Sequence, residues 1–165
     1  MAGVVIYETA ILPEWIDYNG HLRDAYYGLI VSCACDALMD RLRMDAAYRA
    51  RTRGTLYTLE MHMHYLHEIT GAERVAVAAT ILAADHKRIH AGFELRPAAA
   101  SVLAATAELM LLHVRQGKDP GAAAGSEPFP PEVAAAIAAF QAHSPAAGFG
   151  PGSRALGLRG GAQGA

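Results

Sequence analysis

AYYGLIVSCACDALMDRL, residues 25–42, is the stretch on which the fold depends. Its apolar side chains recur at the i, i+3, i+4 and i+7 spacing of a helix with one buried stripe. The expected stripe consists of Tyr26, Ile30, Cys33, Ala34, Ala37 and Leu38. We expect Asp24 to be the N-cap, because its side-chain oxygen suits the free backbone N–H groups there. The sequence therefore predicts one long, buried helix.

Five segments around this helix have the pattern of β-strands. The predicted strands cover residues 4–12, 56–69, 73–84, 88–95 and 101–115. The last one fits a helix equally well by periodicity, but its position after three strands favours a strand. An arginine-rich polar connection over residues 45–54 precedes the second strand, and Asp85-His86-Lys87 predicts a hairpin.

The run LYTLEMHMHYLHEI, residues 56–69, alternates with a period of two, which indicates a strand covered on one side. The covered face is expected to consist of Tyr57, Leu59, Met61, Met63 and Tyr65, and the other face of Thr58, Glu60, His62 and His64. Two histidines beside a carboxylate are one pattern of a zinc site. A polar or subunit-facing surface explains the same alternation, and we expect no metal.

One apolar helix followed by an antiparallel meander is best covered if the sheet curls around the helix. This order predicts an α+β hotdog fold, in which a curved antiparallel five-stranded sheet wraps around one long central helix. We expect it to occupy residues 1–116. Residues 117–165 form a Gly/Pro/Ala-rich C-terminal extension with one short helix at residues 131–143, and the final twenty residues are expected to be loosely ordered.

Composition narrows the class of protein. A length of 165 residues favours one domain, and a net charge of -2 offers no basic surface for a phosphate backbone, so we expect no nucleic-acid partner. The longest apolar runs are shorter than the ~20 residues that span a bilayer, and no basic leader begins the chain. We therefore expect no membrane association and a cytoplasmic location.

Cys33 and Cys35 point to different sides of a helix and are expected to stay unpaired.

Polar and aromatic residues gather directly before the long helix, in EWIDYNGHLRDAYYG at residues 14–28. The group contains a carboxylate (Asp17), a turn (Asn19-Gly20) and His21, together with the four aromatic residues Trp15, Tyr18, Tyr26 and Tyr27. One interpretation is an ordinary helix start, in which Asp17 bonds its own backbone as an Asx-turn. The other interpretation is an active site.

The D-x-N-G-H pattern from Asp17 to His21, with Tyr26 five residues later, resembles the hotdog thioesterases of the 4-hydroxybenzoyl-CoA thioesterase type. The ordered blocks PEWIDYNGHLRDAYY, LYTLEMHMHYLHEI, DHKRIH and ATAELMLLHV are more similar still to the thioesterases of carnitine and betaine metabolism. This resemblance covers residues 4–115. It implies hydrolysis of betainyl-CoA or dehydrocarnitinyl-CoA, with no cofactor beyond the coenzyme A of the substrate. It also implies a site shared between subunits of a homodimer or dimer of dimers, with a carnitine dehydrogenase as a possible partner.

Thioester hydrolysis needs a base or nucleophile and donors for the carbonyl oxygen. The resemblance assigns the first role to Asp17, and free N–H groups around residues 23–26 would polarise the carbonyl. His21 would orient Asp17 or the attacking water, or else bond the loop backbone. Asn19 and Gly20 suit the turn because both tolerate positive φ. The catalytic candidates are Asp17, Asn19, His21 and Glu60.

The acyl pocket is expected to have aromatic walls. A trimethylammonium group has no N–H donors, so it is recognised by aromatic faces and carboxylates. The substrate-binding candidates are Trp15, Tyr18, Gly20, Asp24, Tyr26, Tyr27 and Tyr57. Tyrosines at helical spacing could belong to the core instead. Lys87 and Arg88, at the hairpin, are candidates for holding a phosphate of coenzyme A, although most hairpin cations are simply solvated.

Three functions fit these residues. The first is an acyl-CoA thioesterase for a short, cationic acyl group. The second is a thioesterase for an aromatic or medium-chain acyl group. The third is a non-catalytic hotdog protein that binds an acyl-CoA or a dehydrogenase. Release of free thiol from different thioesters separates the three.

Overall fold

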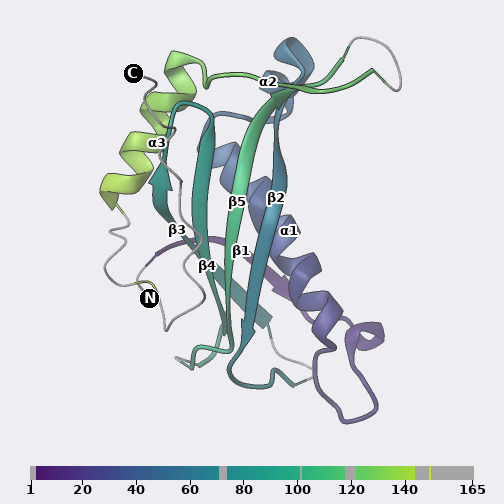
Figure 1. The fold of residues 1–165 in the computed structure, drawn as a ribbon. Helices are drawn as coiled ribbons and strands as arrows, with labels where there is room; N and C mark the ends of the chain where they lie inside the picture. The colour runs from purple at the N-terminus through teal and green to yellow at the C-terminus, as the bar shows by residue number, and fades with distance from the viewer. Residues whose placement is uncertain (1–2, 71–73, 101, 118–121, 144–148, 150–165) are drawn as a thin grey trace, which may run out of the picture.

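The computed structural model describes residues 3–70, 74–100, 102–117, 122–143 and 149. Within them, long antiparallel strands in the order β1-β3-β4-β5-β2 form a sheet that curls around helix α1 (Figure 1). The strands are β1 (Val4–Ala10), β2 (Gly54–Tyr65), β3 (Arg74–Ala84), β4 (Arg88–Pro97), β5 (Ala105–Arg115) and the two-residue β6 (Gly125–Ser126), which pairs with β5. The predicted α+β hotdog fold is confirmed, and the ambiguous last segment is a strand.

The long helix is α1 (Asp24–Arg41), within a residue of its predicted bounds. The predicted cap was wrong, because Arg23 holds the N-cap position and Asp24 is the first helical residue. The Arg23 N–H donates to the Trp15 carbonyl at 2.9 Å, which keeps Arg23 extended. The buried residues of α1 are Tyr27, Ile30, Val31, Ala34, Leu38 and Met39. Tyr26, expected in that stripe, is only partly buried and stacks on Trp15, with ring centroids 5.2 Å apart.

The predicted alternation of β2, with Tyr57, Leu59, Met61, Met63 and Tyr65 on one face, was wrong. A register shift between Thr58 and Glu60 marks a β-bulge, which inserts one residue and reverses which side chains share a face. Tyr57 pairs with Leu112, whereas Met61, Met63 and Tyr65 pair with the core residues Leu109, Ala107 and Ala105. Tyr57 therefore lies on the face opposite to Met61, Met63 and Tyr65. Because β2 is the last strand of the sheet, its apolar side chains remain 43–57% exposed at Tyr57, Leu59, Met61 and Tyr65.

The arginine-rich segment predicted as a connection contains a helix, α2 (Ala46–Thr52). Asp45 caps it by accepting the Tyr48 N–H at 2.8 Å. Tyr48 is 2% exposed, and its hydroxyl lies 2.9 Å from His113 Nε2 on β5. A second short element, the 3-10 turn η1 (Pro13–Trp15), follows β1, which ends at Ala10 rather than at Leu12.

The helix expected in the C-terminal extension is α3 (Pro131–His143). Its Val133 and Ile137, with Phe129 before it, belong to the same hydrophobic cluster as the sheet and α1. The domain boundary at residue 116 stays a prediction, and the expectation of loose order over the final twenty residues concerns residues almost all outside those described. Cys33 and Cys35 are unpaired. Of the described helices, none combines the length and apolar character needed to cross a membrane.

Candidate active site

The loop before α1 holds Asp17 in a fixed turn. Its Oδ1 accepts the backbone N–H of Asn19 at 2.8 Å and of His21 at 3.1 Å. The backbone closes the turn in both directions, because the Asp17 N–H donates to the His21 carbonyl at 2.9 Å and the Gly20 N–H to the Asp17 carbonyl at 3.1 Å. Gly20 has a φ of 82°, a conformation that favours glycine. The Asx-turn and the active-site interpretations are thus compatible, because the turn uses one carboxylate oxygen only.

The surroundings of Asp17 keep it ionised. The His21 backbone N–H lowers the pKa of Asp17 and outweighs the opposing effect of partial burial, and the Asn19 hydrogen bonds lower it further. Both backbone N–H donors bind Oδ1, so within the described part of the chain the second oxygen, Oδ2, accepts no backbone hydrogen bond. A charged oxygen is therefore available to accept a proton or attack a carbonyl.

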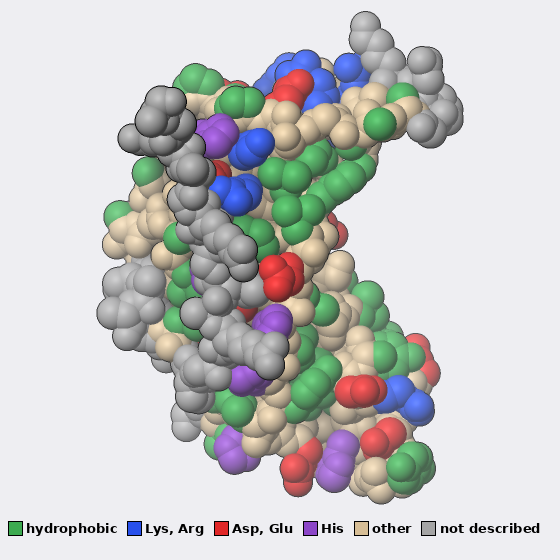
Figure 2. Space-filling model, viewed as in Figure 1, with side chains coloured by type: hydrophobic (Ala, Val, Ile, Leu, Met, Phe, Trp, Pro, Cys, Tyr) green, Lys and Arg blue, Asp and Glu red, His purple; other side chains and the backbone are tan. Residues whose placement is uncertain are grey.

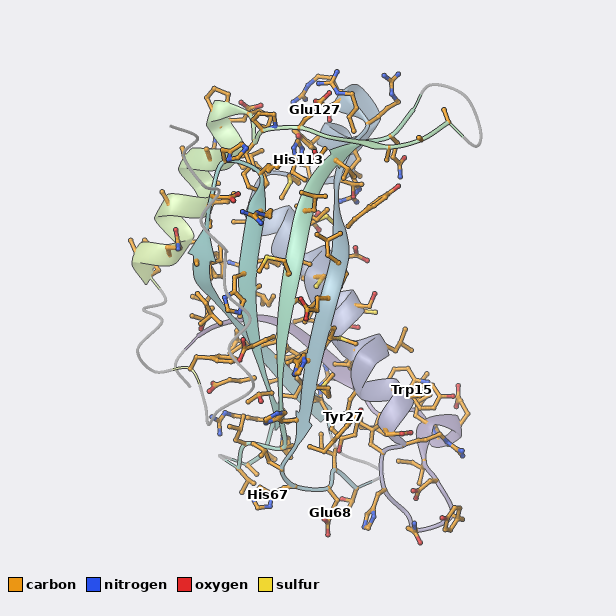
Figure 3. All side chains as sticks on the ribbon, in the orientation of Figure 1. Trp15, Tyr27, His67, Glu68, His113 and Glu127 are labelled. Atoms are coloured by element: carbon orange, nitrogen blue, oxygen red, sulfur yellow. The ribbon has the colours of Figure 1, made fainter. Side chains whose placement is uncertain are left out.

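Asp17 lines a cavity of about 380 Å³ at one end of the sheet. The other lining residues are His21, Leu22, Arg23, Asp24, Tyr27, Tyr65, Leu66, His67 and Glu68. The two walls are joined by the Leu22 N–H, which donates to the Ile69 carbonyl at 2.7 Å. Figure 3 shows Tyr27, His67 and Glu68 at this end of the molecule, with Trp15 beside them. Six of these residues were not among the candidates predicted from the sequence: Leu22, Arg23, Tyr65, Leu66, His67 and Glu68.

The start of α1 supplies one unoccupied donor. Of the backbone N–H groups expected to polarise a carbonyl, that of Arg23 donates to Trp15, that of Tyr26 to the Arg23 carbonyl and that of Ala25 to Asp24 Oδ1. The Asp24 N–H has no partner among the described residues. The first N–H groups of a helix carry a partial positive charge, so this donor favours a developing oxyanion.

The aromatic candidates divide into two groups. Tyr27 lines the cavity and packs edge-on against Tyr65, with ring centroids 5.2 Å apart at 85°. Trp15 and Tyr26 form the stacked pair beside the helix start and do not line the cavity. Tyr18 is 95% exposed on the loop. Trp15, Tyr18 and Tyr26 therefore stay predictions as substrate contacts.

The remaining candidates lie away from this cavity. Asn19 and Gly20 form the turn and are exposed, so a catalytic role for Asn19 and a substrate contact by Gly20 stay predictions. Tyr57 and Glu60 precede Tyr65 on β2 by about 26 and 17 Å, at ~3.3 Å per residue. Lys87 and Arg88 lie at the opposite end of the sheet, because Arg88 pairs with Leu112, the partner of Tyr57. Arg88 is also engaged with Asp85, at 2.7 Å.

The Glu60, His62 and His64 pattern does not assemble a metal site within its own neighbourhood. Across the parts of the chain that the structure describes, no group of three or more His, Cys, Asp or Glu side chains is arranged to hold a metal ion. The register places His62 opposite Glu108, which is itself bonded to His90 at 2.8 Å.

Residues 11–137 match the family described as "Thioesterase-like superfamily"; this range covers η1, the Asp17 loop, α1, α2, strands β2 to β6 and part of α3. The chain belongs to this superfamily. As a thioesterase it hydrolyses thioesters of the acyl-CoA class. The "Betainyl-CoA thioesterase" of Pseudomonas aeruginosa is 43% identical over 138 residues, which cover 83% of this chain and 84% of that protein. The "L-carnitine dehydrogenase/betainyl-CoA thioesterase" of Rhizobium meliloti is 33% identical over 132 residues, which cover 79% of this thioesterase but 25% of that protein.

Solved structures agree with this membership. A Staphylococcus aureus protein crystallised in complex with CoA superposes on the thioesterase with a TM-score of 0.76 and 27% identity, over 88% of this chain and 89% of that chain. A candidate thioesterase from Pseudomonas putida has a TM-score of 0.75 and 35% identity, over 96% and 97% of the two chains.

Proposed function

We propose that this thioesterase hydrolyses betainyl-CoA or dehydrocarnitinyl-CoA, with Asp17 as the base or nucleophile. The observation that supports this most is the Asp17 carboxylate itself, which lines a cavity and has one oxygen fixed by two backbone N–H groups, so that the other oxygen is left without a backbone donor. The relative from Pseudomonas aeruginosa named for betainyl-CoA supports the choice of substrate.

The reaction follows from this geometry. Oδ2 of Asp17 either takes a proton from water, so that the hydroxide attacks the thioester carbon, or attacks that carbon directly. The Asp24 N–H stabilises the negative carbonyl oxygen in both cases, and one such donor is worth about 3 kcal/mol. Collapse of the tetrahedral intermediate breaks the carbon–sulfur bond and releases the thiolate of coenzyme A. Direct attack leaves the acyl group on Asp17 as a mixed anhydride, which water must then hydrolyse to release the acid and restore the carboxylate. In a single turnover in oxygen-18 water, label in the Asp17 carboxylate identifies direct attack, because it enters when that water attacks the aspartyl carbon of the anhydride.

The charge of the cavity favours a cationic acyl group. Three carboxylates line it (Asp17, Asp24 and Glu68) against one guanidinium, that of Arg23. Tyr65 adds an aromatic ring that is 56% exposed, whereas the Tyr27 ring beside it is almost fully buried. Tyr65 is therefore the ring best placed to meet a trimethylammonium group, and Tyr27 fixes its orientation.

Thiol release from acyl-CoA substrates tests the role of Asp17. Asp17→Asn keeps an oxygen that accepts the Asn19 and His21 N–H groups, so the loop retains its turn while the negative charge is lost. We expect kcat to fall at least 100-fold. Thermal stability should fall only slightly, because the charge that lowers the pKa of Asp17 contributes to folding but the turn is kept. Glu14→Gln, which removes an exposed carboxylate three residues away, is the matched control and should retain activity. Near-normal turnover by Asp17→Asn would refute the assignment.

The acyl specificity is tested with a neutral isostere. 3,3-Dimethylbutanoyl-CoA has the shape of betainyl-CoA with carbon in place of the charged nitrogen. We expect the wild type to prefer the cationic substrate, and Tyr65→Leu to reduce that preference about 2- to 30-fold, the equivalent of a 0.5–2 kcal/mol cation–π contact. Tyr65→Phe should retain it. Equal kcat/KM for the two substrates, or faster hydrolysis of 4-hydroxybenzoyl-CoA, would refute the betainyl assignment.

A homodimer formed through β2 is part of this proposal. The outer edge of β2 carries twelve residues with no neighbouring strand in the described part of the chain, and its exposed apolar residues are Tyr57, Leu59, Met61 and Tyr65. An unpaired apolar edge of this length pairs readily with another strand. Tyr65 lies on this edge and also lines the cavity, so a second copy would complete one wall of the site.

A carnitine dehydrogenase stays a proposed partner, supported by relatives that carry both names on one chain.

A further inference from the structure

Strands β3, β4 and β5 have a second face, turned away from α1, which we call the outer face. Side chains alternate along a strand, so the neighbours of the core residues point to this face. Thr80, Gly92 and Glu108 pair across the three strands in its middle. Figure 1 shows the sheet in front of α1, and Figure 2 shows the same side as a surface, with Lys and Arg gathered mainly at the upper end and Asp, Glu and His toward the lower end.

The outer face is buried within a single chain. Its side chains that are only 1–8% exposed are Ala76, Ala78, Thr80, His90, Glu94, Thr106, Glu108 and Met110. Helix α1 does not cause this burial, because it packs on the opposite face. Helix α3 directs Val133 and Ile137 into the core cluster instead. One face of an antiparallel sheet is commonly solvated, so this burial indicates that a further part of the chain covers the outer face.

Phe149 makes such a contact, at Gly92. A Cβ at position 92 would lie 2.7 Å from both Cδ2 and Cζ of the Phe149 ring and closer still to Cε2, nearer than real Cβ atoms approach another heavy atom. Glycine inside a strand weakens it and often marks a place where another group approaches closely. Gly92 lies in β4, between two neighbouring strands, and therefore provides the seat for this aromatic ring.

The position of α3 allows the ring to come from the same chain. His143, the last residue of α3, lines the same cavity as Val4. Val4 pairs with Ala79, one position from the residue that pairs with Gly92, and β3 alone separates β1 from β4. Two strand spacings amount to about 10 Å. Six residues lead from His143 to Phe149, and an extended chain of that length spans up to about 20 Å, enough to pass the edge of the sheet at β1.

The charges of the outer face suit an uncharged segment. Glu108 Oε2 lies 2.8 Å from His90 Nε2, and Glu94 Oε2 lies 3.5 Å from an Arg96 guanidinium nitrogen, so both buried carboxylates have partners on the face itself. Residues 144–153 contain no charged side chain, and Phe149 is the only Phe, Trp or Tyr after residue 140. Such a segment brings no unpaired charge against buried polar groups.

We propose that the segment around Phe149 docks on the outer face of its own subunit and keeps that face from binding a second copy of this chain. Without the segment, the middle of the sheet would present the small residues Ala76, Ala78, Gly92 and Thr106. Faces of this kind allow two sheets to pack about 10 Å apart. The proposal does not depend on the acyl group hydrolysed, because none of these residues lines the Asp17 cavity.

Thermal unfolding of four proteins tests the contact: wild type, Gly92→Ala, Phe149→Ala and the double variant, at one fixed protein concentration. Alanine in place of glycine within a strand ordinarily stabilises it. In the Phe149→Ala background, Gly92→Ala should therefore raise Tm by about 1–4 °C. With the ring present, the gain should be smaller or reversed. Gly125→Ala, whose Cβ would meet no atom within 4 Å, is the matched control and should shift Tm equally in both backgrounds. An equal effect of Gly92→Ala in both backgrounds overturns the proposal.

Sedimentation velocity tests whether the segment keeps a second copy away. Phe149→Ser should form assemblies of twice the wild-type mass, in a proportion that rises with protein concentration, and a wild-type circular dichroism spectrum shows that the variant is folded. Adding Ala78→Glu should restore the wild-type mass, because a charge on the bare outer face opposes contact between two sheets. The proposal fails if Phe149→Ser keeps the wild-type mass at every concentration. It also fails if Ala78→Glu leaves the larger assemblies intact.

Discussion

Removal of one buried hydroxyl should loosen α2 from the sheet. Tyr48 and His113 are both 2% exposed, and the Tyr48 hydroxyl lies 2.9 Å from His113 Nε2. His113 Nδ1 lies 2.9 Å from the Glu127 carbonyl, which can only accept, so Nδ1 carries the proton and Nε2 accepts from Tyr48. Burial raises the pKa of Tyr48, which keeps the hydroxyl a donor at neutral pH. Tyr48→Phe removes the oxygen alone and leaves Nε2 buried without a partner.

We expect Tyr48→Phe to reduce the free energy of unfolding by about 1–3 kcal/mol, the usual penalty for one unsatisfied buried group. At this chain length the loss corresponds to a decrease in Tm of about 2–12 °C. Urea and thermal unfolding, followed by circular dichroism at one fixed protein concentration, measure it. Tyr18→Phe, at a 95% exposed position, is the control and should be neutral. A variant as stable as the wild type would show that the hydroxyl does not hold α2.

Three further outcomes are expected. Gly20→Ala should reduce the free energy of unfolding by about 1 kcal/mol and lower kcat, because alanine disfavours the φ of 82°, although its Cβ would meet no atom within 4 Å. Gly20→Asn should reduce the stability less, as measured by thermal melts. Burial would raise the pKa of Asp85, but the Lys87 N–H and the Arg88 side chain and N–H lower it overall. The ionised Asp85 carboxylate therefore stabilises the fold at pH values above its ordinary pKa of 3.8, and this stabilisation is lost as the pH falls through the lowered pKa. The urea midpoints of wild type and Asp85→Asn should therefore differ at neutral pH. The difference should vanish in acid. Burial, with a smaller contribution from Asp36, raises the pKa of Cys35 to about 12. Iodoacetamide should therefore leave Cys35 unlabelled in the native protein at neutral pH and label it after unfolding, as measured by mass spectrometry.

The long helix and strands could be predicted because the spacing of their apolar residues follows from which side chains are buried. Helix α1 and the five long strands each repeat an apolar pattern over seven or more residues. For β5 the pattern fits a helix equally well, and its position after three strands decided the prediction. Helix α2 has no such stripe, since three arginine or threonine side chains follow Tyr48 within four residues. Its available signal was local: Asp45 three residues before Tyr48 has the spacing of an N-cap.

The cavity was only half predictable. Asp17, His21 and Asp24 lie within eight residues, in the loop before α1 and at its first position, so the motif brings them together in the sequence itself. Tyr65 and Glu68 come from the other side of the cavity, more than forty residues later. They are held there by long-range contacts that no local pattern encodes, among them the backbone hydrogen bond from Leu22 to Ile69 and the bridge between His21 and Thr70. The face of β2 was mistaken for a related reason, because a bulge changes the register without a distinctive residue type.

The extra residue at Leu59 determines which side chains of β2 share a face on its two sides, so the length of the strand matters as well as its residues. Deletion of Leu59 would remove the bulge, so residues 54–58 and residues 60–65 could no longer both keep their present partners on β5. Tyr65 would stay beside Tyr27 only if residues 54–58 changed faces. Insertions and deletions between relatives should therefore be tolerated before Gly54 or after Ile69 but not within this strand, and an alignment that places a gap elsewhere in it would misassign the cavity wall.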